Sequence, residues 1–351
     1  MKNTINTITK TIIKMNTFKI VMLLLFVNLS LIEDGRAQGQ THDFETTKAT
    51  AASNDADFSP DGTKIATYTK DGYIAIWSVK SGNLLQKIPG QKGYISELDW
   101  SPDGKLLASA STNGTIAIWD VASGHLQRTV GDFEPGNTIP YQGTNEVEFS
   151  PNGKFIAGMQ YVPNGEVVVW NISDGEEIVR IEEDTRFNDI GWSADNSSIY
   201  SIDQNGYLSV WSFFKSKLIN KVRLDKQRLV DLDATRQSVI ATGGKSGKIV
   251  LYDTEKKTVK TINQGSFINR VAVTTKFDRV AGAGGDGFLY IYKLSSGELL
   301  YKKYAHDSIN YYVSFSPDGG LLATTGEDNC VRLWNTITGE LVKEIRGQVN
   351  F

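Results

Sequence analysis

The sequence holds few of the residues from which catalytic and metal sites are usually built. Cys330 is its only cysteine, so an intrachain disulfide and a zinc site made of several thiolates are both excluded. The three histidines, His42, His125 and His306, fall in different parts of the chain. We therefore predict no Ser-His-Asp triad and no histidine-rich metal site, and we expect packing to stabilise the fold.

Basic charge is scarce as well. The chain has 37 Lys and Arg residues against 40 Asp and Glu residues, which gives a formal net charge of -3. Binding to DNA or RNA usually requires a concentrated positive field, so we predict no nucleic-acid partner. Proline is rare, with 8 residues, whereas 33 glycines indicate many tight turns.

The sequence has no apolar run long enough to span a membrane, and its longest apolar run lies near the N-terminus. It extends from Ile20 to Ile32, follows several lysines, and precedes Gly35-Arg36-Ala37, which has small residues where a signal peptidase reads. A membrane-spanning helix needs about 20 apolar residues, more than this run provides. We therefore expect residues 1–37 to be a signal peptide and residues 38–53 a linker. The mature protein would have no membrane span and would be periplasmic or secreted.

A repeat of about 41 residues fills the rest of the sequence. Each copy has an alternating apolar segment that ends in an aromatic residue, which we call the anchor. The seven anchors are Trp77, Trp119, Trp170, Trp211, Tyr252, Tyr292 and Trp334. Six residues before each anchor lies a turn former that is usually followed by glycine, as in Asp71-Gly72, which predicts a tight hairpin.

Each copy reads as four strands, and one such sheet cannot bury both of its faces alone. Sheets stacked radially around an axis do bury them. We therefore predict an all-β fold, a seven-bladed β-propeller with four antiparallel strands per blade, over residues 54–348, with residues 349–351 as a tail. The last blade could take its fourth strand from residues 341–345 or from residues 44–49. We favour the C-terminal segment because residues 338–341 repeat the form of residues 296–299.

The Ser-Pro-Asp-Gly motifs and the Trp-Asp or Trp-Asn pairs resemble the WD40 family across residues 54–348. The resemblance is most specific from Ala305-His306 to Trp334-Asn335. It implies a platform for protein interaction, and a polar network of His, Ser or Thr, Asp and Trp in each repeat. The last repeat would supply His306, Asp328 and Trp334, but with Gly326 at the hydroxyl position. Repeats 1 and 2 would supply only two pairs, Thr69 with Asp71 and Ser111 with Asn113, so we expect these networks to be mostly absent.

One glycine-rich segment formally matches a dinucleotide-binding motif. Residues 282–287 fit the pattern GxGxxG, but such a site requires a helix immediately afterwards. The following residues, 288–292, alternate like a strand, so we interpret the segment as a hairpin. We predict that the protein is not an enzyme and has no cofactor.

The third repeat is longer than the others and carries additional aromatic residues. Its two insertions fall in neighbouring loops that a propeller would present on one face. Rigid aromatic side chains contribute strongly to protein interfaces, so we interpret these loops as a partner-binding site. Its residues are Phe133, Pro135, Tyr141 and Tyr161. Neutral growth of the loops is the alternative.

The predicted innermost strands carry acidic residues at alternate positions, which places them on one face of each strand. The acids are Asp55, Asp57, Glu97, Asp99, Glu146, Glu148, Asp189, Asp231 and Asp233. Blade 6 offers Arg270 instead. Asp57, Asp99, Glu148 and Asp233 are our candidates for binding a divalent cation or a basic segment of a partner in the central channel. A water-filled channel with ordinary solvated carboxylates is the interpretation we favour over that hypothesis, and the metal, if any, stays unknown.

Together these features predict a non-catalytic scaffold that binds a protein or peptide on the blade 3 loop face. The alternative is a propeller enzyme, similar to a lyase or lactonase, that uses the acidic channel to bind a cation or a small ligand. Fold alone does not decide between them.

Overall fold

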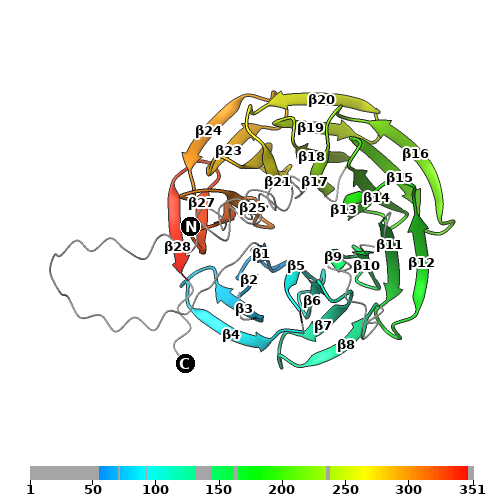
Figure 1. The fold of residues 1–351 in the computed structure, drawn as a ribbon. Coiled ribbons are helices and arrows are strands. Elements are labelled where there is room, and N and C mark those ends of the chain that lie inside the picture. The colour runs from blue at the N-terminus through cyan, green and yellow to red at the C-terminus, as the bar shows by residue number, and fades with distance from the viewer. Residues whose placement is uncertain are drawn as a thin grey trace, which may run out of the picture. The chain divides into compact units, whose positions relative to one another are not determined.

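The chain folds into seven four-stranded antiparallel sheets that are arranged around a central axis (Figure 1). The computed structural model describes residues 55–69, 72–91, 93–131, 144–160, 165–234 and 238–346. In these ranges the only regular elements are strands, and no helix is long and apolar enough to cross a membrane. The predicted all-β, seven-bladed architecture is confirmed.

Each blade begins at the axis and proceeds outward in chain order. Blade 1 comprises β1 (Asp57–Phe58), β2 (Lys64–Tyr68), β3 (Tyr73–Ser78) and β4 (Leu84–Pro89). Blade 2 comprises β5 (Ile95–Trp100), β6 (Leu106–Ser111), β7 (Ile116–Asp120) and β8 (Leu126–Val130). Blade 3 comprises β9 (Thr144–Phe149), β10 (Phe155–Gln160), β11 (Glu166–Asn171) and β12 (Glu177–Glu182). Blade 4 comprises β13 (Phe187–Trp192), β14 (Ser198–Asp203), β15 (Tyr207–Ser212) and β16 (Lys217–Arg223).

The remaining blades repeat this order. Blade 5 comprises β17 (Leu229–Ala234), β18 (Val239–Gly244), β19 (Lys248–Asp253) and β20 (Thr258–Asn263). Blade 6 comprises β21 (Ile268–Thr274), β22 (Arg279–Gly284), β23 (Phe288–Lys293) and β24 (Leu299–Tyr304). Blade 7 comprises β25 (Asn310–Phe315), β26 (Leu321–Gly326), β27 (Cys330–Asn335) and β28 (Leu341–Arg346). The GxGxxG segment is the hairpin between β22 and β23, as predicted.

The last blade takes all four strands from the C-terminal part of the chain. Strand β28 pairs with β27, and Leu333 lies opposite Lys343, as the sequence led us to favour. Blade 7 meets blade 1 through side chains, in an apolar cluster that includes Phe58, Trp77 and Val331.

The turns that join the second and third strands show why glycine recurs there. Gly72, Gly114 and Gly206 have φ angles of 82°, 89° and 83°, and the other predicted turn glycines are also positive. A residue with a Cβ rarely adopts this left-handed conformation, whereas glycine does so without steric cost. In the last blade Asn329 takes the same role with a φ of 60°.

The apolar core lies between neighbouring blades. On each innermost strand, the residue between the two acidic positions points towards the preceding blade. Leu98 of blade 2, for example, packs in one cluster with Ile76 and Ile88 of blade 1. Leu232 of blade 5 packs with Ile202 of blade 4. The seven sheets therefore cover one another's faces, as the repeat predicted.

The polar networks around the tryptophan anchors differ from our expectation. The indole N–H groups donate to hydroxyls ten residues earlier, from Trp77 to Thr67, Trp119 to Ser109, Trp211 to Ser201 and Trp334 to Thr324, each at 2.9 Å. Our assignment of the hydroxyl to the positions of Thr69, Ser111 and Gly326 was wrong. Those positions lie at the end of the second strand or just after it, while the true partners lie two residues earlier, one diagonal step across the ladder from the indole.

The fullest network is in blade 7. The ring of His306 is buried, and its Nε2 lies 2.9 Å from the hydroxyl of Thr324 while its Nδ1 lies 2.7 Å from Asp328. Arg332 also donates to Asp328. Burial lowers the pKa of His306 despite the neighbouring carboxylate. The indole–hydroxyl bond occurs at four anchors. Within the described residues only blade 7 adds a histidine and an aspartate to it, so the expectation that complete networks are mostly absent is confirmed.

Candidate functional site: the axial channel

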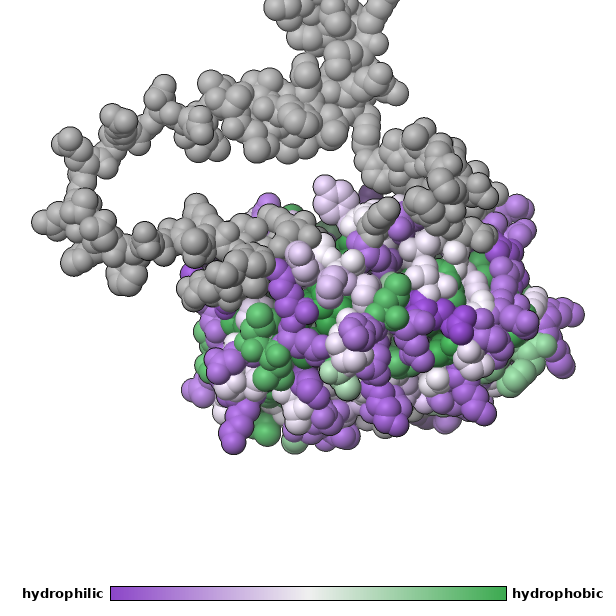
Figure 2. All heavy atoms as spheres, turned by 90° about the horizontal axis from the view of Figure 1, so that it is seen from below, coloured by the Kyte–Doolittle hydropathy of each residue, from purple (hydrophilic) through white to green (hydrophobic). Residues whose placement is uncertain are grey.

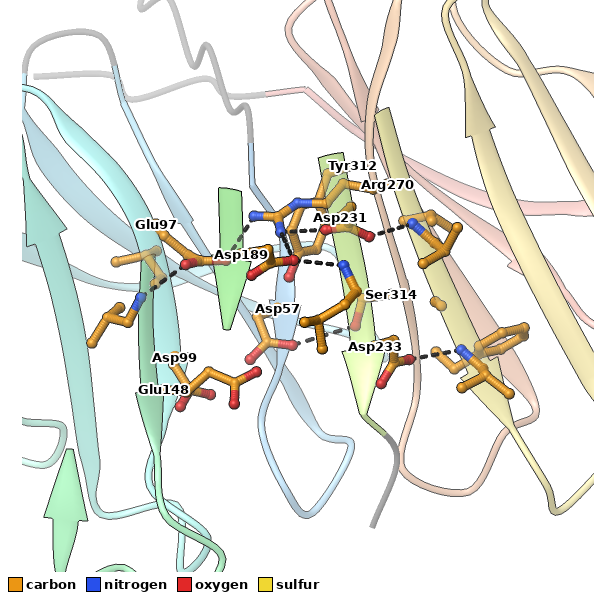
Figure 3. Close-up of a pocket in the computed structure, with 18 residues that line it drawn as sticks. Asp57, Glu97, Asp99, Glu148, Asp189, Asp231, Asp233, Arg270, Tyr312 and Ser314 are labelled. Carbon is orange, nitrogen blue, oxygen red and sulfur yellow. Dashed lines mark hydrogen bonds and ion pairs between the residues drawn. The ribbon is translucent and has the colours of Figure 1, made fainter. Parts of the chain in front are cut away.

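The inward-facing side chains of the innermost strands form two tiers around the axis, two residues apart on each strand. The first tier holds Asp55, Glu97, Glu146, Asp189, Asp231, Arg270 and Tyr312. The second tier holds Asp57, Asp99, Glu148, Gly191, Asp233, Ala272 and Ser314. Members of both tiers line a cavity of about 220 Å³ (Figure 3). The four acids singled out from the sequence are all among its lining residues.

Arg270 supplies an internal cation for the first tier. Its guanidinium donates to Asp231 at 2.5 Å and to Glu97 at 2.6 Å, and Figure 3 shows these two carboxylates converging on it. The carboxylates of Asp189 and Glu146 each lie 3.7 Å from it. Several buried acids thus share one positive charge, which comes from a blade that has no acid at these positions.

Most of the channel carboxylates also bond to the backbone of the next blade. An innermost strand is a sheet edge, so every second N–H group lacks a partner in its own sheet. In the first tier Asp55 accepts from Leu98 N, Glu97 from Val147 N, Asp189 from Leu232 N and Asp231 from Val271 N, at 2.6–2.9 Å. In the second tier Asp99 accepts from Phe149 N, Glu148 from Trp192 N and Asp233 from Val273 N, at 2.5–3.2 Å.

These seven bonds connect blades 1 to 6 in succession. At the corresponding positions blades 6 and 7 carry Arg270, Ala272, Tyr312 and Ser314, which have no carboxylate to offer. Across the last junction the hydroxyl of Ser314 donates to Asp57 at 3.3 Å. We conclude that the acids hold neighbouring blades together.

Burial changes the protonation of this cluster. It raises the pKa of Asp57 and Glu148 well above the ordinary values, with a further increase from the nearby Asp99 carboxylate. It also raises the pKa of Asp233 to about 7. Arg270 keeps its proton although burial opposes the charge, because the carboxylates of Asp231, Glu146 and Glu97 raise its pKa.

The interpretation of ordinary solvated carboxylates is therefore wrong for most of the first tier. Asp55, Glu97, Asp189 and Asp231 are buried, and their oxygens bond to protein groups. Sequence reasoning had placed these acids on the channel but had not foreseen the backbone N–H groups of the neighbouring strand. Within the described part of the chain, no group of three or more His, Cys, Asp or Glu side chains is arranged to hold a metal ion. A cation in the channel stays a prediction.

Replacing Asp233 by asparagine should make the protein more stable at high pH. An aspartate in an unfolded chain titrates near pH 4, whereas Asp233 titrates at about 7 in the folded protein. The folded state therefore binds this proton more tightly, and wild-type stability should fall as the pH rises from about 4 to about 7. Asparagine keeps an acceptor for Val273 N without the charge, so we expect a gain of roughly 1–3 kcal/mol at pH 8 relative to pH 4.

Urea unfolding at several pH values measures this difference. Asp195→Asn is the matched control, because hydrogen bonds from Ser193 and Ser197 lower the pKa of Asp195. The control should show no gain as the pH rises. Equal pH profiles for Asp233→Asn and the wild type would contradict the prediction.

The aromatic loop site of blade 3 lies outside the described residues. Phe133, Pro135, Tyr141 and Tyr161 fall in the gaps 132–143 and 161–164. The first gap lies between β8 of blade 2 and β9 of blade 3, and the second lies between β10 and β11 of blade 3. The antiparallel order of these strands places the two connections on the same face of the ring, as predicted.

The sequence is similar to one family profile and to two proteins that carry WD repeats. A profile described as WD domain, G-beta repeat matches residues 42–78, 82–120 and 297–335. WD repeat-containing protein 1 of Mus musculus is 26% identical over 215 residues, which cover 56% of this chain and 34% of that protein. Actin-interacting protein 1 of Drosophila melanogaster is 26% identical over 212 residues, covering 57% of this chain and 34% of that protein. The chain thus spans about a third of the length of these relatives.

A solved structure has the same architecture. A chain in the crystal structure of the mitotic checkpoint complex superposes with a TM-score of 0.69 at 17% identity. The match covers 87% of this chain and 98% of that chain. At this identity the likeness establishes the fold alone.

Proposed function

Because the chain is a seven-bladed β-propeller that carries WD40 repeats, we propose that it is a non-catalytic scaffold that binds a protein or a peptide. One observation carries this proposal. The channel acids, which are the candidate reactive side chains found from the sequence, already bond to Arg270 and to backbone N–H groups. Side chains engaged in this way hold neighbouring blades together, as a rigid scaffold requires. A general acid or base would instead have to be free to reach a proton of the substrate.

The relatives support the same function. One of them bears the name actin-interacting protein, which describes a protein that binds another protein. We extend only the general role to this chain, and the identity of its partner is open. A periplasmic or extracellular location remains part of the proposal, and it rests on the apolar segment from Ile20 to Ile32 and the residues that follow it.

We place the binding surface on the face that presents the blade 3 loops. Exposed aromatic residues of the described chain occur on this face, at the ends of the outermost strands or in the connections that follow them. Tyr94 precedes β5 and is 75% exposed, while Phe267 and Tyr304 flank blade 6. Aromatic side chains contribute large contact areas at low entropic cost, so this face carries further aromatic contact points besides those proposed at Phe133 and Tyr161.

Affinity capture from the cell that produces the protein tests this surface. The double variant Phe133→Ala, Tyr161→Ala should recover partners at least about tenfold less than the wild type, because two aromatic contacts are each worth roughly 1–2 kcal/mol. The matched control, Phe214→Ala with Phe277→Ala, removes two exposed aromatic residues from the opposite face. It should recover partners normally. Equal recovery by both double variants would remove the blade 3 surface from the proposal.

A further inference from the structure

The boundaries between outer strands, which we call seams, are closed by a recurring side chain. In each blade this side chain belongs to the fourth, outermost strand. Its residue lies opposite the residue that immediately precedes the anchor on the third strand. In four seams it bonds to carbonyls in the turn between the third and fourth strands of the next blade. Arg128 bonds to Ser173 and Asp174, Lys260 to Leu294 and Ser295, Tyr301 to Ile337, and Lys343 to Lys80.

Two further seams are filled in other ways. Between blades 3 and 4 the corresponding residue is Val179, which packs in one cluster with Phe213. Between blades 4 and 5 it is Asn220, which donates to the hydroxyl of Tyr252 at 3.4 Å. In six of the seven seams this residue therefore makes a hydrogen bond or an apolar contact with the next blade.

The seam between blades 1 and 2 is the exception. The corresponding residue, Gln86, lies over Gly124, because a Cβ at Gly124 would come within 2.7 Å of its amide nitrogen. Within the described residues, this side chain makes no hydrogen bond across the seam to the turn of blade 2. A groove of about 530 Å³ lies here, lined by Leu85, Gln86, Val121 and other residues. Figure 2 looks onto the rim from the side of β4 and β8 and shows hydrophobic areas between hydrophilic ones.

The lining of this groove combines three kinds of group. Leu85 is 54% exposed and provides apolar surface together with Val121. Ala122 lies three residues after its anchor, the position whose carbonyl accepts a bond from Tyr301 or Lys343 in two other seams. Lys64 and Lys105 add two amines.

The charges leave these amines available to a ligand. Lys105 lies 3.4 Å from Asp103, but both side chains are largely exposed, and such surface pairs are weak. The one carboxylate in the lining, Asp120, accepts from the backbone and the hydroxyl of Ser123. The groove therefore favours a negatively charged segment.

We propose that this groove is a docking site for a peptide that carries a tyrosine flanked by Asp or Glu. The seam between blades 6 and 7 provides the template, since Tyr301 fills it with its ring near Gly339 and its hydroxyl on the Ile337 carbonyl. In the open seam the tyrosine ring of the peptide packs on Leu85, its hydroxyl donates to the Ala122 carbonyl, and its neighbouring carboxylates pair with Lys64 and Lys105.

This site extends the proposed scaffold and does not depend on the blade 3 surface. The groove is formed by the turns that follow the first and third strands of blade 2, at residues 104–105 and 120–122. In an antiparallel sheet these turns lie at the end opposite to the connections of the blade 3 loops. The protein would thus present one binding surface on each face.

Fluorescence anisotropy with a labelled peptide, Asp-Glu-Tyr-Glu-Asp, tests the site on the full-length protein. The decisive variant is Gln86→Tyr, which copies Tyr301 and closes the seam from within. It should weaken peptide binding at least about tenfold while leaving the melting temperature at or above that of the wild type. Lys64→Glu with Lys105→Glu should weaken binding at least as much, and a peptide with Phe in place of Tyr should bind roughly three- to tenfold more weakly.

The matched control is Lys215→Glu with Lys217→Glu, which reverses two exposed lysines near a turn of the same kind in blade 4. It should bind the peptide like the wild type. No saturation of the wild type up to about 1 mM peptide, or equal binding by Gln86→Tyr, would overturn the proposal. The variant Phe133→Ala, Tyr161→Ala should bind this peptide normally, so failure of the groove and failure of the blade 3 surface give different results.

Discussion

Replacing Arg270 by methionine should lower the free energy of unfolding by about 3–5 kcal/mol at neutral pH. The side chain is only 19% exposed, and its guanidinium lies within ion-pair distance of Glu97, Glu146, Asp189 and Asp231. Methionine keeps most of the aliphatic length but leaves these largely buried carboxylates facing one another without a counter-ion. Like charges in such a place repel strongly.

The loss of unfolding free energy in Arg270→Met should become smaller as the pH falls. Burial raises the pKa of Asp189 and Glu146, so protons neutralise the cluster as the pH falls. The difference between Arg270→Met and the wild type should therefore shrink from pH 7.5 to pH 5 in urea unfolding experiments. Arg346→Met is the control: this arginine is 71% exposed, and its pair with Glu344 should be worth less than about 1 kcal/mol. A loss that does not change with pH would contradict the role of Arg270 as the counter-ion.

Replacing Thr324 by valine should cost about 2–4 kcal/mol, because two buried groups lose their partner at once. The Thr324 hydroxyl accepts from the indole N–H of Trp334 and lies 2.9 Å from Nε2 of His306. Valine has nearly the same shape, so the change tests hydrogen bonding rather than packing. Each buried polar group left unsatisfied costs roughly 1–3 kcal/mol.

The repeat supplies its own controls for this substitution. Thr67→Val in blade 1 removes one bond, from the indole of Trp77, and should cost roughly 1–2 kcal/mol. Thr242→Val in blade 5 should cost less than about 1 kcal/mol, because its anchor is Tyr252, which has no indole N–H, and its hydroxyl makes only a long bond of 3.4 Å to the Val250 carbonyl. Thermal or chemical unfolding of the three variants should give the order Thr324, Thr67, Thr242. Any other order would show that packing dominates.

The architecture was predictable because the four strands of each blade follow one another directly in the sequence. The anchors recur about every 41 residues, and each hairpin glycine lies a fixed distance before its anchor. Strand pairing depends on these short-range signals, so Tyr252 and Tyr292 were placed correctly although the Ser-Pro-Asp-Gly motif has decayed in their repeats. The alternation of acids on the innermost strands likewise placed them on the channel.

The contacts between blades were not predictable in the same way. Arg270 and Glu97 are 173 residues apart, and only the closed ring brings them together. The bonds from channel acids to backbone N–H groups depend on the angle between blades, which no periodicity encodes. The open seam did leave a trace in the sequence, because Gln86 aligns with Arg128, Tyr301 and Lys343, whose side chains are longer or more strongly hydrogen bonding.

The placement of β28 in the same sheet as β25, β26 and β27 has a consequence for how the chain folds. No described ladder joins the first blade to the last, so every strand pairing in the described part of the chain is made between residues of one repeat. Local pairings form quickly because short loops lose little entropy on closing. Each blade can therefore assemble its strand ladders independently of the other six, and the meeting of the two ends becomes a late step that is driven by side chains.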